Sequence, residues 1–386
     1  MKKETKVLFE LLKNAVFGIE IDEQTKADAS ENAELLYKMA RHHDLAHLVE
    51  YAFKTNGIKT DDRAAAYELL KSQALAIMRY EDLSYALTEI SELLENERIP
   101  FIPLKGAVIR QFYPEPWMRT SCDIDILVHE DDLDRAEKAL VEKLGYNSSG
   151  RKNYHDISLY SETDVHLELH FNIKENMKNV DRLLEKVWDY AVPVKEGKFE
   201  HKLSNEFFMF QIVAHMSYHV YGGGCSVRCF MDLLLLDTKL FMDKAVFGEM
   251  LKECGLEKFC EISLKLARIW FSDGIHNEIT DVYQRYLLNG GIYGTKMNSI
   301  AAKDSKKSNF SYAVSRIFMP YEQLCITYPK LKEKKYLFPF YQVKRWLRTV
   351  KNRRYLEVSK EFDANDSVTR QNASDYSKLI EKLELK

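Results

Sequence analysis

Residues 104–128 read LKGAVIRQFYPEPWMRTSCDIDILV and carry two acids, Asp123 and Asp125, among apolar residues that favour a buried strand. Side chains alternate along a strand, so both carboxylates point to one face while Ile124 and Ile126 point to the other. Two negative charges on an interior strand cost free energy unless something positive lies between them. Oxygen ligands at this spacing can converge on a divalent cation such as Mg²⁺.

A third acid falls in phase on a later segment. In residues 164–173, DVHLELHFNI, the apolar residues alternate, which places His166, Glu168 and His170 together on the opposite face. If this strand neighbours the strand of the two aspartates, Glu168 supplies a third carboxylate. Three acids can hold two metal ions that clamp the attacking and leaving oxygens of a phosphoryl transfer. The alternative is a solvated edge strand with an incidental Asp-x-Asp, which the apolar flanks disfavour.

The region around these acids alternates short apolar runs with turns, which predicts a small α/β unit. Pro114 and Pro116 force an irregular connection. Asp131 or Asp132 is expected to cap a helix that closes at Gly145. The expected elements are a strand at 99–106, a short helix at 107–113, a strand at 121–129, a helix at 133–146, a turn at 147–153, and strands at 155–161 and 164–173.

Both flanks of this unit carry apolar residues at three- and four-residue spacing, which predicts helices. Ser204 is expected to cap the first helix after the unit. A chain of 386 residues can form two or three domains. We predict an α+β fold in which a small mixed β-sheet is flanked by helical regions. Its predicted parts are an N-terminal helical region (1–95), the α/β core (96–200), a C-terminal helical domain (201–355) and a polar tail (356–386).

The composition limits the classes of function. Charged residues make up 30% and hydrophobic residues 46%, and the net charge of −3 gives the whole chain no electrostatic footprint for nucleic acid. No run of about 18 apolar residues occurs, so we expect no membrane span. The six cysteines are scattered along a chain that needs no disulfides, so we expect reduced thiols and a cytoplasmic location.

Lys105 and Gly106 stand where the first strand ends and a helix begins. Glycine lets the backbone approach a ligand, and the first amides of a helix can donate to a phosphate. Lys105 adds a positive charge. Arg110 and Arg119 could neutralise a triphosphate, because a guanidinium makes bidentate contacts with phosphate. The alternative is a tight turn next to ordinary ion pairs.

Two histidines mark the helix that follows Ser204. His215 and His219 are four residues apart and share one face, which either lines the substrate cleft near His170 or carries ordinary hydrogen-bonded histidines. A zinc site is disfavoured because Met216, not Glu, follows His215. Further along, Arg228 and Asp232 have the spacing of an i,i+4 ion pair. Arg228 is a candidate contact to a nucleobase or phosphate.

The segment 330–354 mixes many lysines and arginines with aromatic residues. This composition fits an amphipathic helix that packs its apolar stripe into the core while its cations stay solvated. It also fits binding to single-stranded nucleic acid or tRNA, or to a membrane surface. We favour packing among the three.

The stretch PFIPLKGAVIRQFYPEPWMRTSCDIDILVHEDDLDRAEKALVEKLGY (100–146), followed by HLELHF (166–171), resembles the polymerase-β-type nucleotidyltransferase superfamily. It is most similar to an uncharacterised bacterial nucleotidyltransferase group with a Leu-Lys-Gly turn, a Tyr-Pro-x-Pro loop and an Asp-Ile-Asp core. The resemblance covers most of residues 30–240.

This resemblance implies transfer of a nucleoside monophosphate from an NTP, such as ATP, to an acceptor hydroxyl with release of pyrophosphate. Asp123 and Asp125 would bind the metal, two Mg²⁺ ions. Glu168 would be the third carboxylate and a candidate base. Gly106 would belong to the phosphate-cradling turn. The superfamily turn is usually Gly-Ser, and here Lys105 would replace the serine contact.

Two other hypotheses stay open: a nucleotide-binding module that acts through partners without turnover, and a metal-dependent phosphohydrolase. The acceptor can be a small molecule, a protein side chain or an RNA end. The sequence does not select the nucleobase or the oligomeric state.

Overall fold

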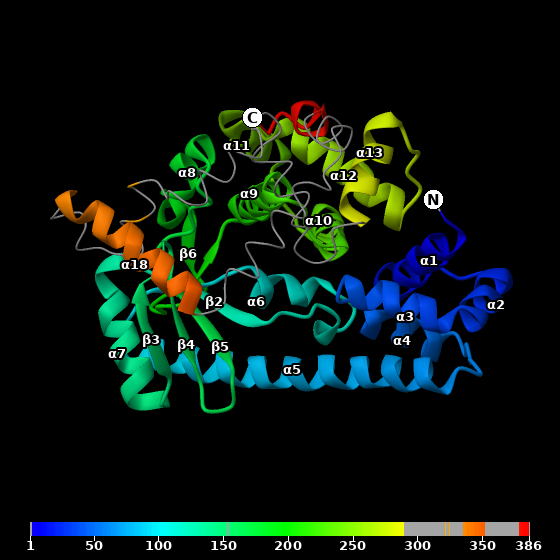
Figure 1. Cartoon of the computed structure of the whole chain (residues 1–386), viewed down its shortest axis with the longest axis horizontal. Coiled ribbons are helices and arrows are strands. Elements are labelled where there is room, and N and C mark those ends of the chain that lie inside the picture. The colour runs from blue at the N-terminus through cyan, green and yellow to red at the C-terminus, as the bar shows by residue number, and fades with distance from the viewer. Residues whose placement is uncertain are drawn as a thin grey trace.

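The structure is a computed structural model, and it describes residues 2–152, 154–288, 321, 324, 335–351 and 378–385. Its architecture is α+β, as predicted: one small mixed sheet lies among helices that precede and follow it in the chain (Figure 1). In the part of the chain that the structure describes, no helix is both long and apolar enough to cross a membrane.

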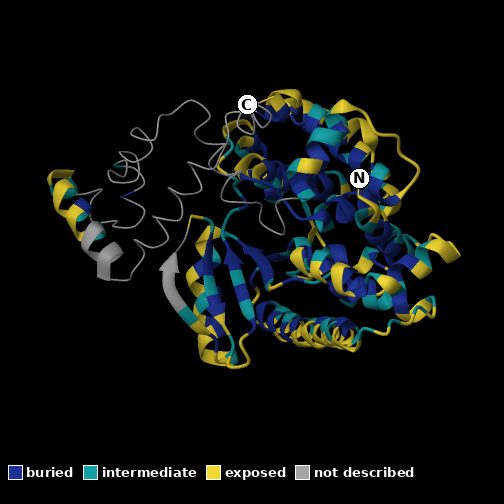
Figure 2. Ribbon diagram, turned by 45° about the vertical axis from the view of Figure 1, so that its right-hand side comes forward, coloured by how far each residue is buried: buried dark blue, intermediate teal, exposed yellow. Residues whose placement is uncertain are grey.

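A long helix, α5 (Arg63–Asn96), runs beneath the sheet and the other N-terminal helices (Figure 1). It begins at Asp62, whose Oδ1 accepts hydrogen bonds from the backbone N–H groups of Ala64 and Ala65, each at 3.0 Å. The side of α5 that faces the sheet is buried, and its outer side is exposed (Figure 2). The shorter N-terminal helices are α1 (Lys3–Phe17), α2 (Glu23–Glu31), α3 (Ala33–His42) and α4 (Ala46–Thr55).

The five-stranded sheet has the order β1-β2-β5-β4-β3. Its central pair, β2 and β5, is parallel, and the other three pairs are antiparallel. The register of the parallel pair places Asp123 beside His166 and Asp125 beside Glu168. The strands are β1 (Phe101–Pro103), β2 (Asp123–Val128), β3 (Asn147–Lys152), β4 (Asp156–Tyr160) and β5 (His166–His170).

The connection from β1 to β2 contains a short helix, α6, that starts earlier than predicted. It begins at Lys105, two residues before the predicted start at 107, and the chain then tightens into a 3₁₀ turn. The bounds are α6 (Lys105–Ile109), η1 (Arg110–Phe112) and η2 (Pro116–Met118). The second connection holds η3 (Glu130–Asp132) and α7 (Leu133–Leu144), which ends at Gly145 as predicted.

The two faces of β2 belong to different cores. Ile124 and Ile126 pack in the smaller core with apolar residues of α5 and α7. Leu127, on the other face, packs in the larger core together with the N- and C-terminal helices. Asp123 and Asp125 share the face of Leu127 because side chains alternate. They are therefore directed away from α5, toward the helices that follow the sheet.

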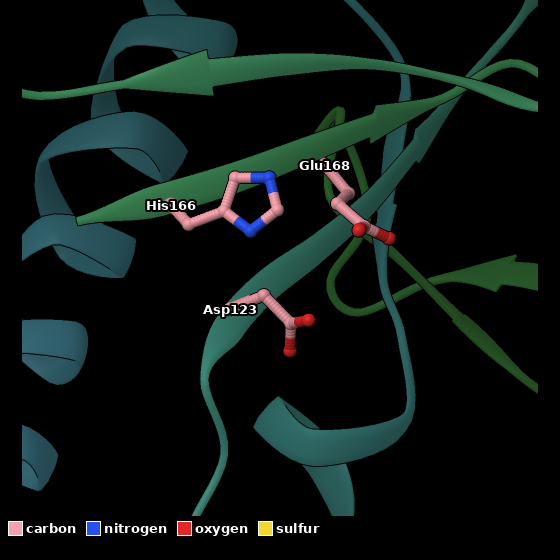
Figure 3. Close-up of side chains that lie close together, drawn as sticks. All are labelled: Asp123, His166 and Glu168. Atoms are coloured by element: carbon pink, nitrogen blue, oxygen red, sulfur yellow. The ribbon is translucent and has the colours of Figure 1, made fainter. Parts of the chain in front are cut away.

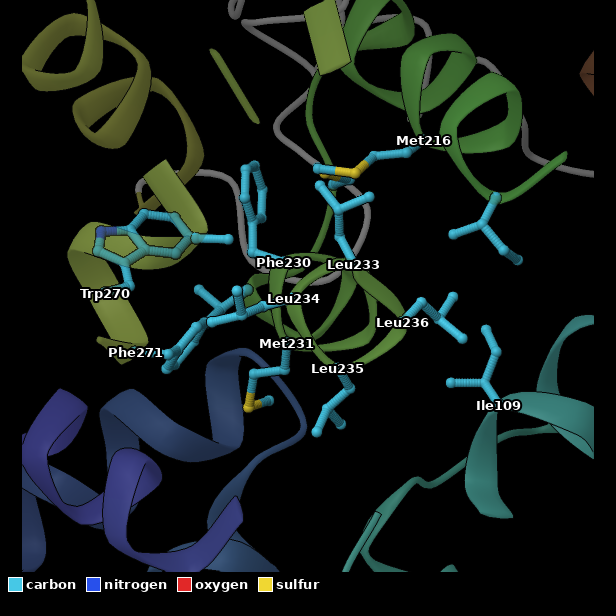
Figure 4. Close-up of a cluster of buried hydrophobic side chains, with 14 of the residues drawn as sticks. Ile109, Met216, Phe230, Met231, Leu233, Leu234, Leu235, Leu236, Trp270 and Phe271 are labelled. Carbon is cyan, nitrogen blue, oxygen red and sulfur yellow. The ribbon is translucent and has the colours of Figure 1, made fainter. Parts of the chain in front are cut away.

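The C-terminal helices start with α9, which Ser204 caps as predicted: its Oγ accepts a hydrogen bond from the backbone N–H of Phe207 at 3.3 Å. The second of them, α10, is buried nearly all round, between Trp270 and Phe271 on one side and Ile109 of α6 on the other (Figure 4). The helices are α9 (Asn205–Gly222), α10 (Val227–Lys239), α11 (Lys244–Cys254), α12 (Glu257–Phe271) and α13 (Glu278–Leu288).

The predicted turn at 147–153 is wrong for the residues that are described. Residues 147–152 form the edge strand β3, which pairs antiparallel with β4 across a register shift between Ser148 and Lys152. Pairing with a formed neighbour supplies the backbone hydrogen bonds, so a polar sequence can still be a strand. Four further elements had no predicted counterpart: α8 (Lys178–Leu184), η4 (Val187–Tyr190) and the hairpin of β6 (Ala191–Pro193) with β7 (His201–Leu203).

Parts of the two C-terminal segments lie outside the described residues. Within the basic segment 330–354, the described residues form η5 (Lys335–Leu337) and α18 (Phe338–Lys351), where Tyr336 and Phe340 are exposed. Within the predicted tail 356–386, the described residues 378–385 bury apolar side chains in the larger core, namely Leu379, Ile380, Leu383 and Leu385. The predicted boundaries at 95, 200 and 355 stay predictions.

Candidate functional site

Two aspartates and a glutamate lie side by side on the parallel strands β2 and β5. The parallel register sets Asp125 directly beside Glu168, with Asp123 one pleat away on the same face. Asp125 is 8% exposed, so its charge is largely withdrawn from water. Burial and the nearby carboxylates of Asp125 and Glu168 raise the pKa of Asp123. Such a cluster needs positive groups close by.

One of these positive groups is His170, at the end of β5. Its Nε2 lies 2.9 Å from Oδ1 of Asp125 and 3.4 Å from Oε2 of Glu168. Burial alone would lower the pKa of His170, but the hydrogen bonds to the two carboxylates raise it to about 9. The imidazole is therefore protonated at neutral pH and neutralises part of the acidic cluster. The bond to His170 in turn lowers the pKa of Glu168.

The second positive group is Lys105, at the first residue of α6. Burial would lower the pKa of its ammonium group, but the carboxylates around it outweigh burial and raise that pKa; they are Asp125, Glu175, Glu168 and Asp123. Asp125, although buried, has a lowered pKa because Lys105 and His170 stabilise its charge. The backbone of Lys105 has φ = 33°, a strained value for a residue with a side chain. This strain sets the entry of the chain into α6.

The neighbours of Gly106 leave little room for a side chain. A Cβ added there would lie 3.0 Å from Nη1 of Arg119 and 3.4 Å from Cβ of Ser121. Arg110 supports the same turn from behind: its Nε donates to the carbonyl oxygen of Gly106 at 3.0 Å, and its Nη2 donates to Oγ of Ser121 at 3.1 Å. The turn is thus packed on one side by two arginines, only one of which reaches the cleft.

Arg119 is held by α10. Its Nη2 donates to Oδ2 of Asp232 at 3.1 Å, and the hydroxyl of Tyr113 donates to Oδ1 of Asp232 at 2.7 Å. The predicted pair between Arg228 and Asp232 is therefore wrong. Arg228 instead donates through Nη1 to Oγ1 of Thr120 at 2.7 Å and forms an ion pair with Asp44 at 3.2 Å. Arg228 and Asp232 therefore each pair with residues from distant segments of the chain, which their spacing on the helix could not reveal.

The predicted face of α9 does carry both histidines together. Nε2 of His219 lies 3.1 Å from Nε2 of His215, and Nδ1 of His215 lies 2.7 Å from Oε1 of Glu175. Burial lowers the pKa of both histidines, to about 3 for His219. Burial of most of its side chain would raise the pKa of Glu175, yet its hydrogen bond to His215 and the charge of Lys105 lower that pKa to about 2. The result is a Glu–His–His chain next to Lys105.

These groups surround one cavity of about 330 Å³ between the sheet, α6, α9 and α10. Eight of the ten residues that the sequence singled out line it: Lys105, Gly106, Arg119, Asp123, Asp125, Glu168, His215 and Arg228. Arg110 and His170 are not among the described residues that line the cavity. Each forms a hydrogen bond to a residue that does line it, namely Gly106 and Asp125. A cavity with three acids and several cations can hold a charged, phosphate-bearing ligand together with metal.

The donor atoms fit a metal. Two groups of side chains bring their polar atoms within 4.8 Å of one another: Asp123 with His166 and Glu168, and Asp125 with Glu168 and His170. In the second group His170 donates to both carboxylates, so only Asp125 and Glu168 offer ligand atoms there. Glu168 belongs to both groups, so it is placed to bridge two neighbouring positions. Figure 3 shows Asp123, His166 and Glu168 projecting from β2 and β5 into a common space. Carboxylate oxygens with room for water and phosphate are the ligands that Mg²⁺ prefers.

Sequence reasoning missed some members of the site. Glu175 lies after β5 and Asp44 lies before α4, and neither belongs to a recognisable spacing pattern. His166 had been placed on the correct face, but its position next to Asp123 depends on the register between β2 and β5. Only that register could have identified it as a potential ligand.

Comparison with known proteins assigns the chain to a family. The family model described as "uncharacterised nucleotidyltransferase" matches residues 29–272, well over half of the chain. The chain belongs to this family, and the protein is a nucleotidyltransferase, as the resemblance in sequence implied. Neither the curated proteins nor the solved structures contain a match.

Proposed function

We propose that this enzyme transfers a nucleoside monophosphate from an NTP to an acceptor hydroxyl and releases pyrophosphate, with a divalent metal held by Asp123, Asp125 and Glu168. The observation that carries the proposal is the parallel register of β2 and β5, which lines up these three carboxylates on one wall of the cavity. A divalent ion bound there would neutralise the charge on the phosphate oxygens.

The residues on the other side of the cavity fit the phosphate chain. Lys105 lines the cavity. In the described part of the chain its ammonium group makes no hydrogen bond or ion pair, so its N–H groups are available to a ligand. Gly106, which has no side chain, lets the guanidinium of Arg119 pack closely against the turn. Arg119 presents a fixed guanidinium because Asp232 holds it. Arg228 also lines the cavity, and its guanidinium is held by hydrogen bonds to Asp44 and Thr120.

Glu168 and His170 have distinct roles in the proposal. Glu168 is the candidate for accepting the proton of the acceptor hydroxyl as its oxygen attacks the α-phosphorus, while the bond to pyrophosphate breaks and pyrophosphate leaves with the electron pair. His170 orients Asp125 and Glu168 through its hydrogen bonds to both. It therefore acts through the carboxylates and not on the substrate.

The test follows label from each NTP into acceptors. Purified protein is incubated with each α-labelled NTP, Mg²⁺ or Mn²⁺, and cell extract, and pyrophosphate release is measured in parallel. Asp123→Asn should abolish both signals while circular dichroism shows an intact fold, and Asp134→Asn, an exposed aspartate on α7, should change neither. Label incorporation by Asp123→Asn at the wild-type rate would contradict the proposal.

Two other results would favour a different function for the protein. Tight NTP binding without pyrophosphate release, across small-molecule, protein and RNA acceptors, would indicate a binding module. Hydrolysis of phosphate esters with no labelled acceptor would indicate a phosphohydrolase. We also propose a cytoplasmic location, which the free thiols of the described cysteines support.

A further inference from the structure

A nitrogen donor lies next to the carboxylates that line the cavity. His166 on β5 lies directly beside Asp123 on β2, and Glu168 is the next residue on the same face of β5. The ligand atoms of the three side chains lie within 4.8 Å of one another (Figure 3). They come from adjacent positions on two paired strands, so the backbone hydrogen bonds of the sheet fix their spacing.

The imidazole of His166 is held ready to bind. Its ring is stacked on Tyr160 of β4, with centroids 4.6 Å apart and planes 8° from parallel. Its Nε2 is buried and has no hydrogen-bond partner among the described residues. A buried nitrogen without a partner costs free energy, and a native protein usually satisfies such a group with a ligand, an ion or water. An ion bound between Asp123 and Glu168 would be within reach of this imidazole, one nitrogen of which lies within 4.8 Å of a carboxylate oxygen of each acid.

The second imidazole of the cluster is placed differently. Nε2 of His170 already contacts Oδ1 of Asp125 and Oε2 of Glu168. It is directed at the carboxylates themselves, so His170 positions these two ligands. His166 makes no such contact and is free to act as a ligand in its own right.

We propose that Asp123, His166 and Glu168 form one metal position with His166 as a nitrogen ligand, and that this position takes a first-row transition ion such as Mn²⁺ in preference to Mg²⁺. The inference rests on the proposed function, because Asp123 and Glu168 are shared with the proposed catalytic metal site. Its new content is the imidazole ligand and the ion that it selects.

The choice of ion follows from the donor set. Mg²⁺ prefers oxygen ligands only, whereas imidazole nitrogen is a common ligand of transition ions. Two carboxylates and one imidazole form a mixed nitrogen and oxygen set. Mn²⁺ accepts both donor types and leaves positions for water and phosphate oxygens. The two neighbouring positions that share Glu168 would then differ in their preference for metals.

The test measures metal binding directly and needs no acceptor. The full chain is titrated with Mn²⁺, and free Mn²⁺ is followed by its paramagnetic resonance signal; Mg²⁺ affinity is measured by competition. Pulsed spectra of bound Mn²⁺ should show coupling to an imidazole ¹⁴N. His166→Asn should lose that coupling and weaken Mn²⁺ binding by at least about tenfold. Its Mg²⁺ affinity should change by less than about threefold, since Mg²⁺ does not depend on the nitrogen.

Control variants make each outcome decisive. His276→Asn changes a histidine outside the cavity and should match the wild type. His166→Gln replaces the nitrogen by an amide oxygen, so it should lower the preference for Mn²⁺ over Mg²⁺ even if His166→Asn folds poorly. Unchanged Mn²⁺ affinity in folded His166→Asn or His166→Gln, or nitrogen coupling that persists in either, would overturn the inference. Loss of all metal binding in Asp123→Asn alone would still support the proposed function.

Discussion

Arg119 and Asp232 form a buried ion pair, 3.1 Å between Nη2 and Oδ2, that ties the loop before β2 to α10. Their side chains are 12% and 5% exposed. The hydroxyl of Tyr113 donates to the second oxygen of the same carboxylate at 2.7 Å. Asp232 thus satisfies two buried donors at once, and it connects the part of the cavity wall formed by Arg119 to the helical core.

Asp232→Ala should therefore destabilise the protein strongly. The substitution leaves the charge of Arg119 buried without its partner, a loss of about 3–5 kcal/mol in the free energy of unfolding. Urea denaturation followed by circular dichroism measures this loss. Glu261→Ala, which removes the exposed pair between Lys258 and Glu261, is the control and should change stability by less than about 1 kcal/mol. Similar midpoints for the two variants would show that the buried pair does not matter.

Gly106→Ala should disturb the turn at the start of α6. The new Cβ would lie 3.0 Å from Nη1 of Arg119, and the ion pair with Asp232 restricts how far that guanidinium can move. We expect a destabilisation of about 1–3 kcal/mol and weaker NTP binding in calorimetry. Gly248→Ala on α11 is the control: a Cβ there meets nothing within 4 Å, so it should stabilise by up to about 1 kcal/mol. NTP affinity equal to that of the wild type in Gly106→Ala would show that the placement of Arg119 against this turn does not matter for NTP binding.

The alternation of residues along each strand allowed the acidic faces to be predicted. It did not allow the neighbour of each acid on the adjacent strand to be predicted. A period of two residues fixes which side chains of a strand share a face, so Asp123, Asp125 and Glu168 were identified correctly as members of acidic faces. The pairing of Asp123 with His166 depends on which strands meet and in what register. That is a tertiary property, and the sequence pattern of either strand alone does not contain it.

The partners of the charged residues and the edge strand β3 could not be predicted from the sequence for a similar reason. Asp44 pairs with Arg228 across 184 residues, and Glu175 contacts His215 across 40 residues. Local spacing pointed instead to Arg228 and Asp232, which are four apart but find other partners. The polar run at 147–152 has the composition of a turn, and only the hydrogen bonds offered by β4 make it a strand.

The stability of the protein should fall at acidic pH, in part through Glu175 and His215. The pKa of Glu175 is lowered to about 2 in the folded protein from 4.5, so its stabilisation is present above pH 4.5 and is lost as the pH falls toward 2. Burial also lowers the pKa of His215 below 6.5, so protonation on acidification opposes folding in the same direction. Glu175→Gln should remove on the order of 2–3 kcal/mol of stability at pH 7.

That variant should also flatten the acid side of the stability curve. Urea midpoints measured between pH 3 and pH 7 provide the comparison. Glu23→Gln is the control, because Glu23 is exposed and should leave the curve unchanged. A Glu175→Gln curve parallel to the wild type down to pH 3 would mean that this glutamate does not contribute to the acid lability.

Lys105→Met should weaken NTP binding by about 10–100-fold, because a charge-assisted hydrogen bond to a phosphate contributes about 1.5–3 kcal/mol. The carboxylates around the cavity keep the ammonium group of Lys105 charged, and this group makes no hydrogen bond or ion pair within the described residues. Calorimetry with a non-hydrolysable NTP measures the loss. Lys138→Met, on the exposed side of α7, is the control and should bind NTP like the wild type. If Lys105→Met weakened binding of the nucleoside monophosphate as much as binding of the triphosphate, the role of Lys105 would be to neutralise the acids. If binding of the monophosphate stayed at the wild-type level, Lys105 would be assigned to the β- and γ-phosphates.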